Sequence, residues 1–195
     1  MDERLQKQID FILEIDKLKT ITRQTHITGF SRKENDAEHG WHMALMAYLL
    51  AEYAREPIDV GRVMLMCLIH DIVEIDAGDT YAYDSVGLAT QKAREEAAKE
   101  RIYALLPEDQ RQTLVGVFDE FEAGETAEAR FARAMDNLQP LLLNHSNNGG
   151  DWREHDVVAA QVYARQARTE AGSAVLYELT KDILAENIKK GNLKE

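Results

Sequence analysis

The stretch IHDIVEIDAGD, residues 69–79, follows a run of apolar residues typical of a buried helix. It places His70 directly beside Asp71. Glu74 follows one helical turn after His70, so a helix through this stretch presents both side chains on one face. Burying an imidazole and a carboxylate among apolar side chains is costly unless they are paired or bind a metal. A divalent cation is the simplest compensation, and its other ligands must come from elsewhere in the chain.

The composition is that of an ordinary globular chain. Its 195 residues are 45% hydrophobic and 30% charged, which is enough to form one sizeable core. Only three prolines are present, and Ala, Leu, Glu, Lys and Arg are abundant, which favours helices. Alternating apolar strand patterns, repeats and low-complexity tracts are absent from the sequence. We therefore predict a single all-α domain over residues 1–195.

The net charge of −12 argues against broad nucleic-acid binding, which needs a basic surface. It does not exclude a small phosphorylated substrate, because a metal and local positive charge can reverse the field at one site. The single cysteine, Cys67, lies in an apolar run and excludes a disulfide framework. The first residues are charged and lack a signal-type apolar core, and no apolar run approaches about 18 residues. We therefore expect no membrane segment and a cytoplasmic location.

Positive charge gathers in one segment of this acidic chain. An amphipathic helix is expected over 3–17, and residues 17–31 then read as a long connecting loop that is β-branched, basic and bounded by a glycine. An anionic ligand nearby would explain the change of sign, and a solvated basic loop is the competing explanation. The basic residues of this segment and its flank are Lys17, Lys19, Arg23, Arg32 and Lys33.

Asn35 begins the next predicted helix as its cap, with Glu38 three residues later, as in a capping box. This helix carries His39 and His42 one turn apart, so both can face one site. His39 is a candidate metal ligand if the helix before His70 packs beside it. We interpret His42 as a hydrogen-bonded neighbour of the site.

The rest of the chain reads as further helices, and Asp136 is the residue of interest among them. It lies within the apolar stripe of a helix over 127–144, where it is either solvent-facing or buried and compensated. Pro140 is expected to bend or interrupt that helix, and a polar loop is expected over 144–150. Helix starts are predicted at Asp59, Pro107 and Thr126, an end at Gly124, and further helices over 88–105, 154–170 and 173–190.

Four side chains on three predicted helices form a consistent ligand set. They are two imidazoles and two carboxylates, each in or beside an apolar stretch, and they suit a borderline divalent ion such as Mn, Co, Fe, Ni or Zn. Such a set leaves coordination positions open for water and substrate. A purely oxygen site, as for Ca, would not need two histidines. The four residues are His39, His70, Asp71 and Asp136.

The order H…HD…D of these ligands resembles that of the HD-domain metal-dependent phosphohydrolases. Three further segments, RKENDAEH at 32–39, HDIVE at 70–74 followed by Gly78-Asp79, and LLPE at 105–108, are similar to those of the 5′-deoxynucleotidase branch. The resemblance covers about residues 17–145. It implies an all-helical bundle of the HD-domain type, with C-terminal helices at about 154–190 packing on this core.

The resemblance also implies an activity and roles for residues. Members are usually dimeric and hydrolyse deoxynucleoside 5′-monophosphates to deoxynucleoside and phosphate with a divalent cation, here Mn, Co, Fe, Ni, Zn or Mg. The chain departs from this pattern at Gln24. In one bacterial branch an aromatic residue follows the phosphate-binding arginine and helps to orient the phosphate, whereas Gln24 follows Arg23 here. By position, His39, His70, Asp71 and Asp136 are metal ligands, Glu74 and Asp79 are catalytic or hold a second cation, and Arg23, Asp79 and Thr80 contact the substrate.

Two other functions remain open at this stage. The same ligands serve hydrolysis of a nucleoside diphosphate, a triphosphate or a signalling nucleotide, although a larger substrate needs more basic residues than the segment from Arg23 to Lys33 supplies. A metal-containing nucleotide-binding protein without turnover is the second alternative. Glu74 and Asp79 argue against it, because a purely structural metal closes its coordination shell and needs no extra carboxylates.

Overall fold

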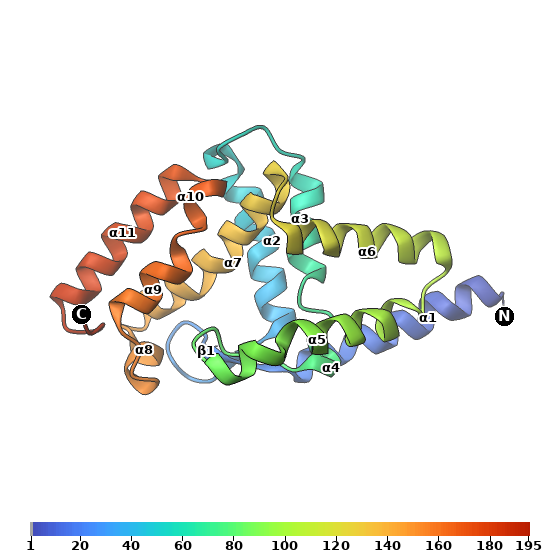
Figure 1. Ribbon diagram of the computed structural model, residues 1–195, viewed down its shortest axis with the longest axis horizontal. Helices are drawn as coiled ribbons and strands as arrows, with labels where there is room; N and C mark the ends of the chain where they lie inside the picture. The colour runs from blue at the N-terminus through green and yellow to red at the C-terminus, as the bar shows by residue number, and fades with distance from the viewer. Residues whose placement is uncertain (1) are drawn as a thin grey trace.

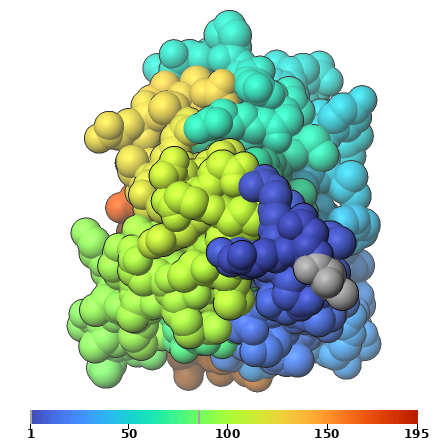
Figure 2. Space-filling view, turned by 90° about the vertical axis from the view of Figure 1, so that its right-hand side faces the viewer, coloured from blue at the N-terminus to red at the C-terminus, as the bar shows by residue number. Residues whose placement is uncertain are grey.

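Helix α7, Ala127–Ser146, runs through the middle of the molecule in a computed structural model that describes residues 2–195, and most other helices pack around it (Figure 1). Its buried side chains include Phe131, Met135 and Leu138, none of which has any exposed surface. The amino-terminal helix lies against the yellow-green region of α5 (Ser85–Tyr103) and α6 (Glu108–Ala123) in Figure 2. There, Arg4 donates two hydrogen bonds to Asp109 of α6 at 2.7 and 2.8 Å.

The elements follow one another in this order: α1 (Glu3–Ile15), the 3-10 helix η1 (Asp16–Thr20), β1 (Thr22–His26), β2 (Lys33–Asn35), α2 (Asp36–Leu50), η2 (Ala51–Tyr53), α3 (Val60–Ile69), α4 (Glu74–Ala77), α5 (Ser85–Tyr103), α6 (Glu108–Ala123), α7, α8 (Gly150–Glu154), α9 (Ala159–Gln166), α10 (Thr169–Gly172) and α11 (Ala174–Lys189). The all-helical prediction is confirmed apart from one small hairpin. Within the described residues, no helix combines the length and apolar character needed to cross a membrane.

The hairpin replaces most of the loop predicted over 17–31. Strands β1 and β2 are antiparallel, with Thr22 opposite Asn35 and His26 opposite Lys33. The β-branched residues that suggested a loop also suit a pleated strand. A two-stranded ribbon is marginal in water, so the contacts of β1 with α7 and α8 are needed to hold it. Those contacts join residues more than a hundred positions apart, which explains why the local sequence did not reveal the strand.

The predicted helix caps are confirmed. Asn35 accepts a hydrogen bond from the Glu38 backbone N–H at 3.0 Å, and Glu38 accepts one from the Asn35 backbone at 3.2 Å, which completes the capping box. Asp59 and Thr126 cap α3 and α7, each accepting one hydrogen bond from the backbone N–H three residues later. Gly124 ends α6 in the left-handed conformation, which costs glycine little because it has no Cβ.

Three predicted boundaries are wrong. Helix α3 ends at Ile69, and a turn separates it from α4, so His70 and Glu74 do not share one continuous helix. Helix α7 is not interrupted at Pro140 and continues to Ser146, beyond the loop expected from 144, although Pro140 has no N–H to donate to the carbonyl of the preceding turn. Packing of the buried leucines on both sides of Pro140 outweighs that loss. The helix predicted over 154–170 is interrupted: residues 155–158 lie outside any helix, α9 covers Ala159–Gln166, and α10 begins at Thr169.

Helices α2 and α3 approach each other closely enough to bring their histidines together. A Cβ added at Gly40 of α2 would lie 2.9 Å from the carbonyl oxygen of Cys67 in α3. Glycine is therefore required at this crossing. Because His39 precedes Gly40 and His70 follows Cys67 by one turn, the crossing places the two imidazole rings 5.5 Å apart, measured between their centroids.

Candidate metal centre

The four predicted metal ligands converge at the meeting point of α2, α3 and α7. One ligand atom each of His39, His70 and Asp136 lies within 4.8 Å of the others. His39 Nε2 is 3.3 Å from Asp136 Oδ1, and His70 Nε2 is 3.9 Å from the same oxygen. Asp71 Oδ1 is 3.0 Å from His70 Nε2, and its second oxygen is 4.0 Å from His39 Nε2. The Asp136 side chain is 17% exposed, so it is largely withdrawn from solvent and is compensated by the imidazoles, which resolves the choice that its sequence context left open.

Both imidazoles present the same nitrogen, Nε2, to the carboxylates. His39 Nδ1 donates to Gln139 Oε1 at 3.0 Å, and His70 Nδ1 donates to the Cys67 carbonyl at 3.0 Å. These bonds assign the proton to Nδ1 in each neutral ring and leave the lone pair on Nε2. His70 Nε2 is buried without a hydrogen-bond partner among the described residues. Two such nitrogens facing carboxylate oxygens fit a borderline divalent cation.

The charges of the cluster favour a cation at this point. Burial alone would raise the pKa of Asp71, but His70 and Arg23 outweigh burial and lower it to about 2. Burial would likewise raise the pKa of Asp136, and the His39 hydrogen bond and Arg165 lower it. Burial and Arg23 would lower the pKa of His39, but Asp136 and Glu34 raise it to about 9. Both carboxylates are thus ionised, and a proton and a divalent cation compete for the imidazole nitrogens.

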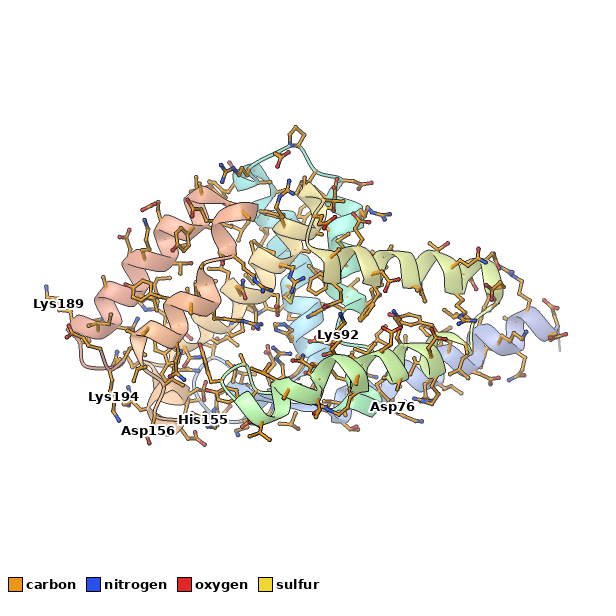
Figure 3. The ribbon with its side chains drawn as sticks, in the orientation of Figure 1. Asp76, Lys92, His155, Asp156, Lys189 and Lys194 are labelled. Atoms are coloured by element: carbon orange, nitrogen blue, oxygen red, sulfur yellow. The ribbon has the colours of Figure 1, made fainter. Side chains whose placement is uncertain are left out.

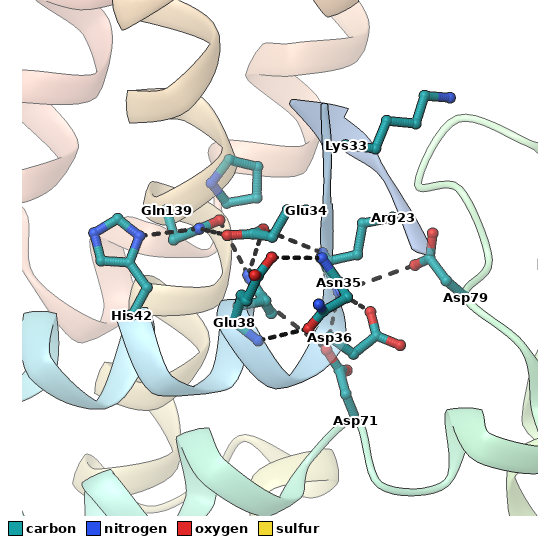
Figure 4. A network of polar contacts seen from close by, with 12 residues as sticks. Arg23, Lys33, Glu34, Asn35, Asp36, Glu38, His42, Asp71, Asp79 and Gln139 are labelled. Carbon is teal, nitrogen blue, oxygen red and sulfur yellow. Dashed lines mark hydrogen bonds and ion pairs between the residues drawn. The ribbon is translucent and has the colours of Figure 1, made fainter. Parts of the chain in front are cut away.

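Gln139 connects the metal-ligand cluster to a second layer of polar groups (Figure 4). Its amide nitrogen donates to Glu34 Oε1 at 2.6 Å and contacts His42 Nδ1 at 3.1 Å. His42 is therefore a hydrogen-bonded neighbour, as the sequence suggested. Gln139 and Glu34 were missed. The only available signal for Gln139 was its position one turn after Asp136 on α7.

Arg23 of β1 is largely buried and faces the carboxylates (Figure 4). Its Nη1 donates to Asp71 Oδ2 at 2.9 Å and to Asp36 Oδ1 at 3.3 Å, and it lies 4.0 Å from Asp79 Oδ1. Its Nε is buried without a hydrogen-bond partner within residues 2–195. Arg23 also lines the adjoining cavity. Its guanidinium therefore neutralises the carboxylates and retains donors for an anionic ligand.

A second acidic cluster adjoins the first. Ligand oxygens of Asp36, Glu74 and Asp79 lie within 4.8 Å of one another. Burial first, and then the charges of Asp71 and Asp36, raise the pKa of Glu74 well above its ordinary value. Burial and Asp71 raise the pKa of Asp36 to about 7. Such a cluster either retains a proton or holds a cation. Asp36 was missed because its place beside Asn35 read only as a helix start.

A cavity of about 830 Å³ opens onto both clusters. This volume is sufficient for a nucleotide-sized ligand. Thr80 lines the cavity together with Asp79, and its hydroxyl accepts a hydrogen bond from Arg94 at 2.7 Å. Basic side chains from the second half of the chain and from α5 also line it. Lys92, which projects from α5 in Figure 3, is one of them, and the others include Arg165 and Arg168.

Comparison with known proteins identifies sequence relatives. A family described as HD domain matches residues 15–176. Human 5′-deoxynucleotidase HDDC2 is 29% identical over 135 residues, which cover 69% of this chain and 65% of the human protein. The 5′-deoxynucleotidase YfbR of Shigella flexneri is 28% identical over 122 residues, which cover 58% of this chain and 61% of that protein. The match therefore spans just under two thirds of the length of each of these relatives.

Two solved structures share the fold. A crystal structure from Magnetospirillum magnetotacticum MS-1, described as a predicted metal-dependent phosphohydrolase, is 50% identical with a TM-score of 0.95. It covers all of this chain, which in turn covers 97% of that one. A conserved hypothetical protein from Pyrococcus furiosus has a TM-score of 0.63 at 24% identity and shows likeness of fold alone.

Proposed function

The chain belongs to the HD domain family, and from this premise we propose that it is a metal-dependent phosphohydrolase acting as a 5′-deoxynucleotidase. The substrate would be a deoxynucleoside 5′-monophosphate, and the products deoxynucleoside and phosphate. The observation that carries the proposal is the pair of imidazoles whose Nε2 atoms face ionised carboxylates at the edge of a nucleotide-sized cavity. The names of the human and Shigella relatives support the choice of substrate.

His39, His70, Asp71 and Asp136 would hold the cation. Two nitrogen and two oxygen donors suit Mn, Co, Fe, Ni or Zn better than a purely oxygen site would. When bound, such a cation supplies Lewis acidity and lowers the pKa of water toward neutrality. The chain itself must bind the phosphate, place the attacking water opposite the leaving group and protonate the 5′ oxygen.

Arg23 is the proposed phosphate-binding residue. It lies beside the ligand Asp71 and also lines the cavity, so a phosphate held there stays next to the metal ligands. A guanidinium offers parallel donors to two phosphate oxygens, which a single ammonium group does not. Because Arg23 is held on one side by Asp71 and Asp36, its plane is oriented before substrate arrives.

Glu74 is the proposed proton donor to the departing 5′ oxygen. It is buried beside Asp36 and Asp79, and three carboxylates at such spacing cannot all ionise in a poorly solvated site. The cluster therefore retains a proton near neutral pH, which general acid catalysis requires. A second cation in this cluster would displace that proton, and the stoichiometry of cation binding distinguishes the two states. Asp79 and Thr80, at the cavity wall, are the proposed contacts to the sugar.

A nucleotide with additional phosphates is the second candidate substrate. Lys92 and Arg168 line the same cavity as Arg23, and they supply the further positive charge that the segment from Arg23 to Lys33 lacked. The two candidates differ in the position of cleavage. Release of inorganic phosphate from monophosphates supports the first, and cleavage restricted to longer phosphate chains supports the second.

The test is phosphate release from a panel of deoxynucleoside and ribonucleoside monophosphates, with Mn, Co, Mg, Zn or no cation added. Wild type is compared with Asp71→Ala, and each protein's cation binding is measured in parallel. Cation-dependent release from deoxynucleoside monophosphates that is lost in Asp71→Ala supports the proposal. A wild-type protein that binds the cation and releases no phosphate from any monophosphate contradicts it.

We further propose that the protein acts as a homodimer through the outer face of α2. Trp41, Tyr48 and Leu49 lie on one stripe of this helix with Leu45, and the first three are 60%, 65% and 68% exposed. Helical spacing makes such residues contiguous, and large exposed apolar patches mark interaction sites. Leu49→Glu should convert a dimer to monomers in sedimentation or light scattering, whereas Val86→Glu on α5 should not. A wild-type protein that is monomeric at all concentrations contradicts this assignment.

A further inference from the structure

Asp136 has two oxygens that face different partners. Oδ1 faces the Nε2 atoms of His39 and His70, while Oδ2 accepts a hydrogen bond from Arg165 Nη2 at 3.2 Å. Arg165 comes from α9, one of the C-terminal helices that were expected to pack on the core. The contact joins the outer oxygen of a proposed metal ligand to a cationic side chain that also lines the cavity.

Arg165 is held in this place by the residue that follows it. Gln166 is 3% exposed, and its amide nitrogen donates to the backbone carbonyl of Asn137 at 2.7 Å. Its amide oxygen accepts a hydrogen bond from the Thr169 hydroxyl at 3.2 Å. Consecutive residues of α9 thus meet consecutive residues of α7. A buried amide with both ends bonded is a specific anchor, because leaving either end unpaired is costly.

Asp71, the other carboxylate of the proposed metal centre, is arranged in a similar way. Its Oδ2 accepts from Arg23 at 2.9 Å while its Oδ1 faces His70. Each carboxylate therefore has one oxygen bonded to a guanidinium, while its other oxygen makes its closest approach to an imidazole. A carboxylate held in this way offers one oxygen to a cation rather than both, which keeps a coordination position free for water or substrate.

We propose that Arg165 is a positioning residue that orients Asp136 for metal binding, so that α9 closes the metal centre from the C-terminal side. The inference rests on the proposed metal centre. It assigns Arg165 an effect on cation affinity and on the ligand field before any substrate is present. A residue that only contacts substrate would change KM and leave both properties unaltered.

The experiment uses the full chain with Co(II) alone as the probe. Cation affinity is measured by calorimetry and the ligand field by the visible spectrum of Co(II). The variants are Arg165→Met, Arg165→Gln and Arg165→Lys, and the matched control is Arg168→Met, because Arg168 is an exposed arginine that lines the same cavity. Thermal unfolding of each metal-free variant identifies any variant that fails to fold. If Arg165→Met or Arg165→Gln does not fold, Arg165→Lys is compared with wild type instead.

We expect Arg165→Met and Arg165→Gln to bind Co(II) about 10- to 100-fold more weakly with an altered spectrum, in the range found when groups behind metal ligands are removed. Arg165→Lys should restore part of the Co(II) affinity, and Arg168→Met should match wild type in Co(II) affinity and in the Co(II) spectrum. Folded Arg165 variants with wild-type affinity and spectrum overturn the proposal, as does a change confined to KM. If wild type binds no divalent cation, the proposed metal centre itself fails, and this is seen before any variant is compared.

Discussion

The side-chain oxygen of Gln139 lies 3.0 Å from Nδ1 of His39, and neither residue has any exposed surface. Asp136, one turn earlier on α7, lies 3.3 Å from the other nitrogen of the same ring. Helix α7 therefore contacts both sides of one imidazole and decides which nitrogen is available. Gln139 therefore orients His39 for the proposed metal centre.

Replacing Gln139 by leucine should weaken Mn(II) or Co(II) binding about 10- to 100-fold, because His39 loses the acceptor that fixes its tautomer and ring orientation. Calorimetric titration of the folded variant measures the change. Asn187→Leu is the matched control: Asn187 is a buried amide on α11 that bonds to His145 and Ile183. It should lower stability and leave cation affinity unaltered. Equal cation affinity in Gln139→Leu and wild type would show that the contact has no such role.

Glu74→Gln should lower phosphate release at least about 100-fold while cation binding at the imidazoles is retained, since proton transfer contributes about 10²- to 10⁴-fold in enzymes. The glutamine keeps the shape and removes the proton donor. Glu95 is a half-buried carboxylate on α5 that lines the same cavity and serves as the control. Phosphate release by Glu95→Gln should stay within a few-fold of wild type. Turnover that survives in Glu74→Gln would be inconsistent with the assigned role.

Arg23→Met should destabilise the metal-free protein by about 3 to 5 kcal/mol, because breaking a buried pair leaves charges uncompensated, here those of Asp71 and Asp36. Added Mn(II) should recover part of the loss by neutralising Asp71. Thermal melts with chelator and with Mn(II) measure this, and the rise in melting temperature on adding Mn(II) should exceed that of wild type. An equal rise in both proteins would contradict the prediction.

Gly40→Ala should destabilise the protein by about 1 to 3 kcal/mol, since its Cβ would press on the Cys67 carbonyl at the α2–α3 crossing. The same carbonyl accepts the His70 hydrogen bond, so cation affinity should also fall. Gly116→Ala on α6 is the matched control, because a Cβ there meets nothing within 4 Å. It should stabilise by about 0.5 to 1 kcal/mol through helix propensity. Denaturant unfolding of both variants measures these changes in the free energy of unfolding. An equal change in the two variants would contradict the prediction.

A surface ion-pair network should add a stabilising contribution that acid removes. Arg101 of α5 bonds to Glu14 of α1 at 2.7 Å and to Asp76 of α4. Hydrogen bonds from Lys17 and Arg101 lower the pKa of Glu14. The stability contributed by Glu14 is therefore present above its unfolded pKa of about 4.3 and is lost as pH falls through the lower folded value.

Arg101→Met should cost about 0.5 to 1 kcal/mol at pH 7, a modest value because Arg101 is half exposed and solvent screens the pairs. The difference from wild type should shrink as pH falls below about 4. Urea unfolding of both proteins across this range measures it. A difference that stays constant with pH would indicate that Arg101 acts through packing alone.

Local signals in the sequence predicted most of the helices and singled out the residues of the proposed metal centre. Asn35, Asp59 and Thr126 were identified as caps because capping joins a side chain to the backbone two or three residues away. His39, His70, Asp71 and Asp136 stood out because imidazoles and carboxylates in apolar helices need compensation. Each of these inferences depends on neighbours within a few turns of the residue concerned.

The β hairpin and the groups that support the ligands were not predictable in this way. Strand β1 depends on contacts with α7 and α8, and the contact between Gln139 and His39 spans a hundred positions of the chain. The continuity of α7 through Pro140 also depends on burial of that helix among its neighbours. Helix propensity and turn chemistry do not report such long-range packing.

The sequence by itself determined an all-helical chain carrying two imidazoles and several carboxylates that need a common partner, because periodicity, capping and the cost of burying charge act locally. Only the tertiary structure decided that Asp36 joins Glu74 and Asp79, that Gln139 sets the tautomer of His39, and that Arg165 holds the outer oxygen of Asp136. The physical reason is that hydrogen bonds and ion pairs act over a few ångströms, and only the crossing of α2, α3, α7 and α9 brings these residues to that distance.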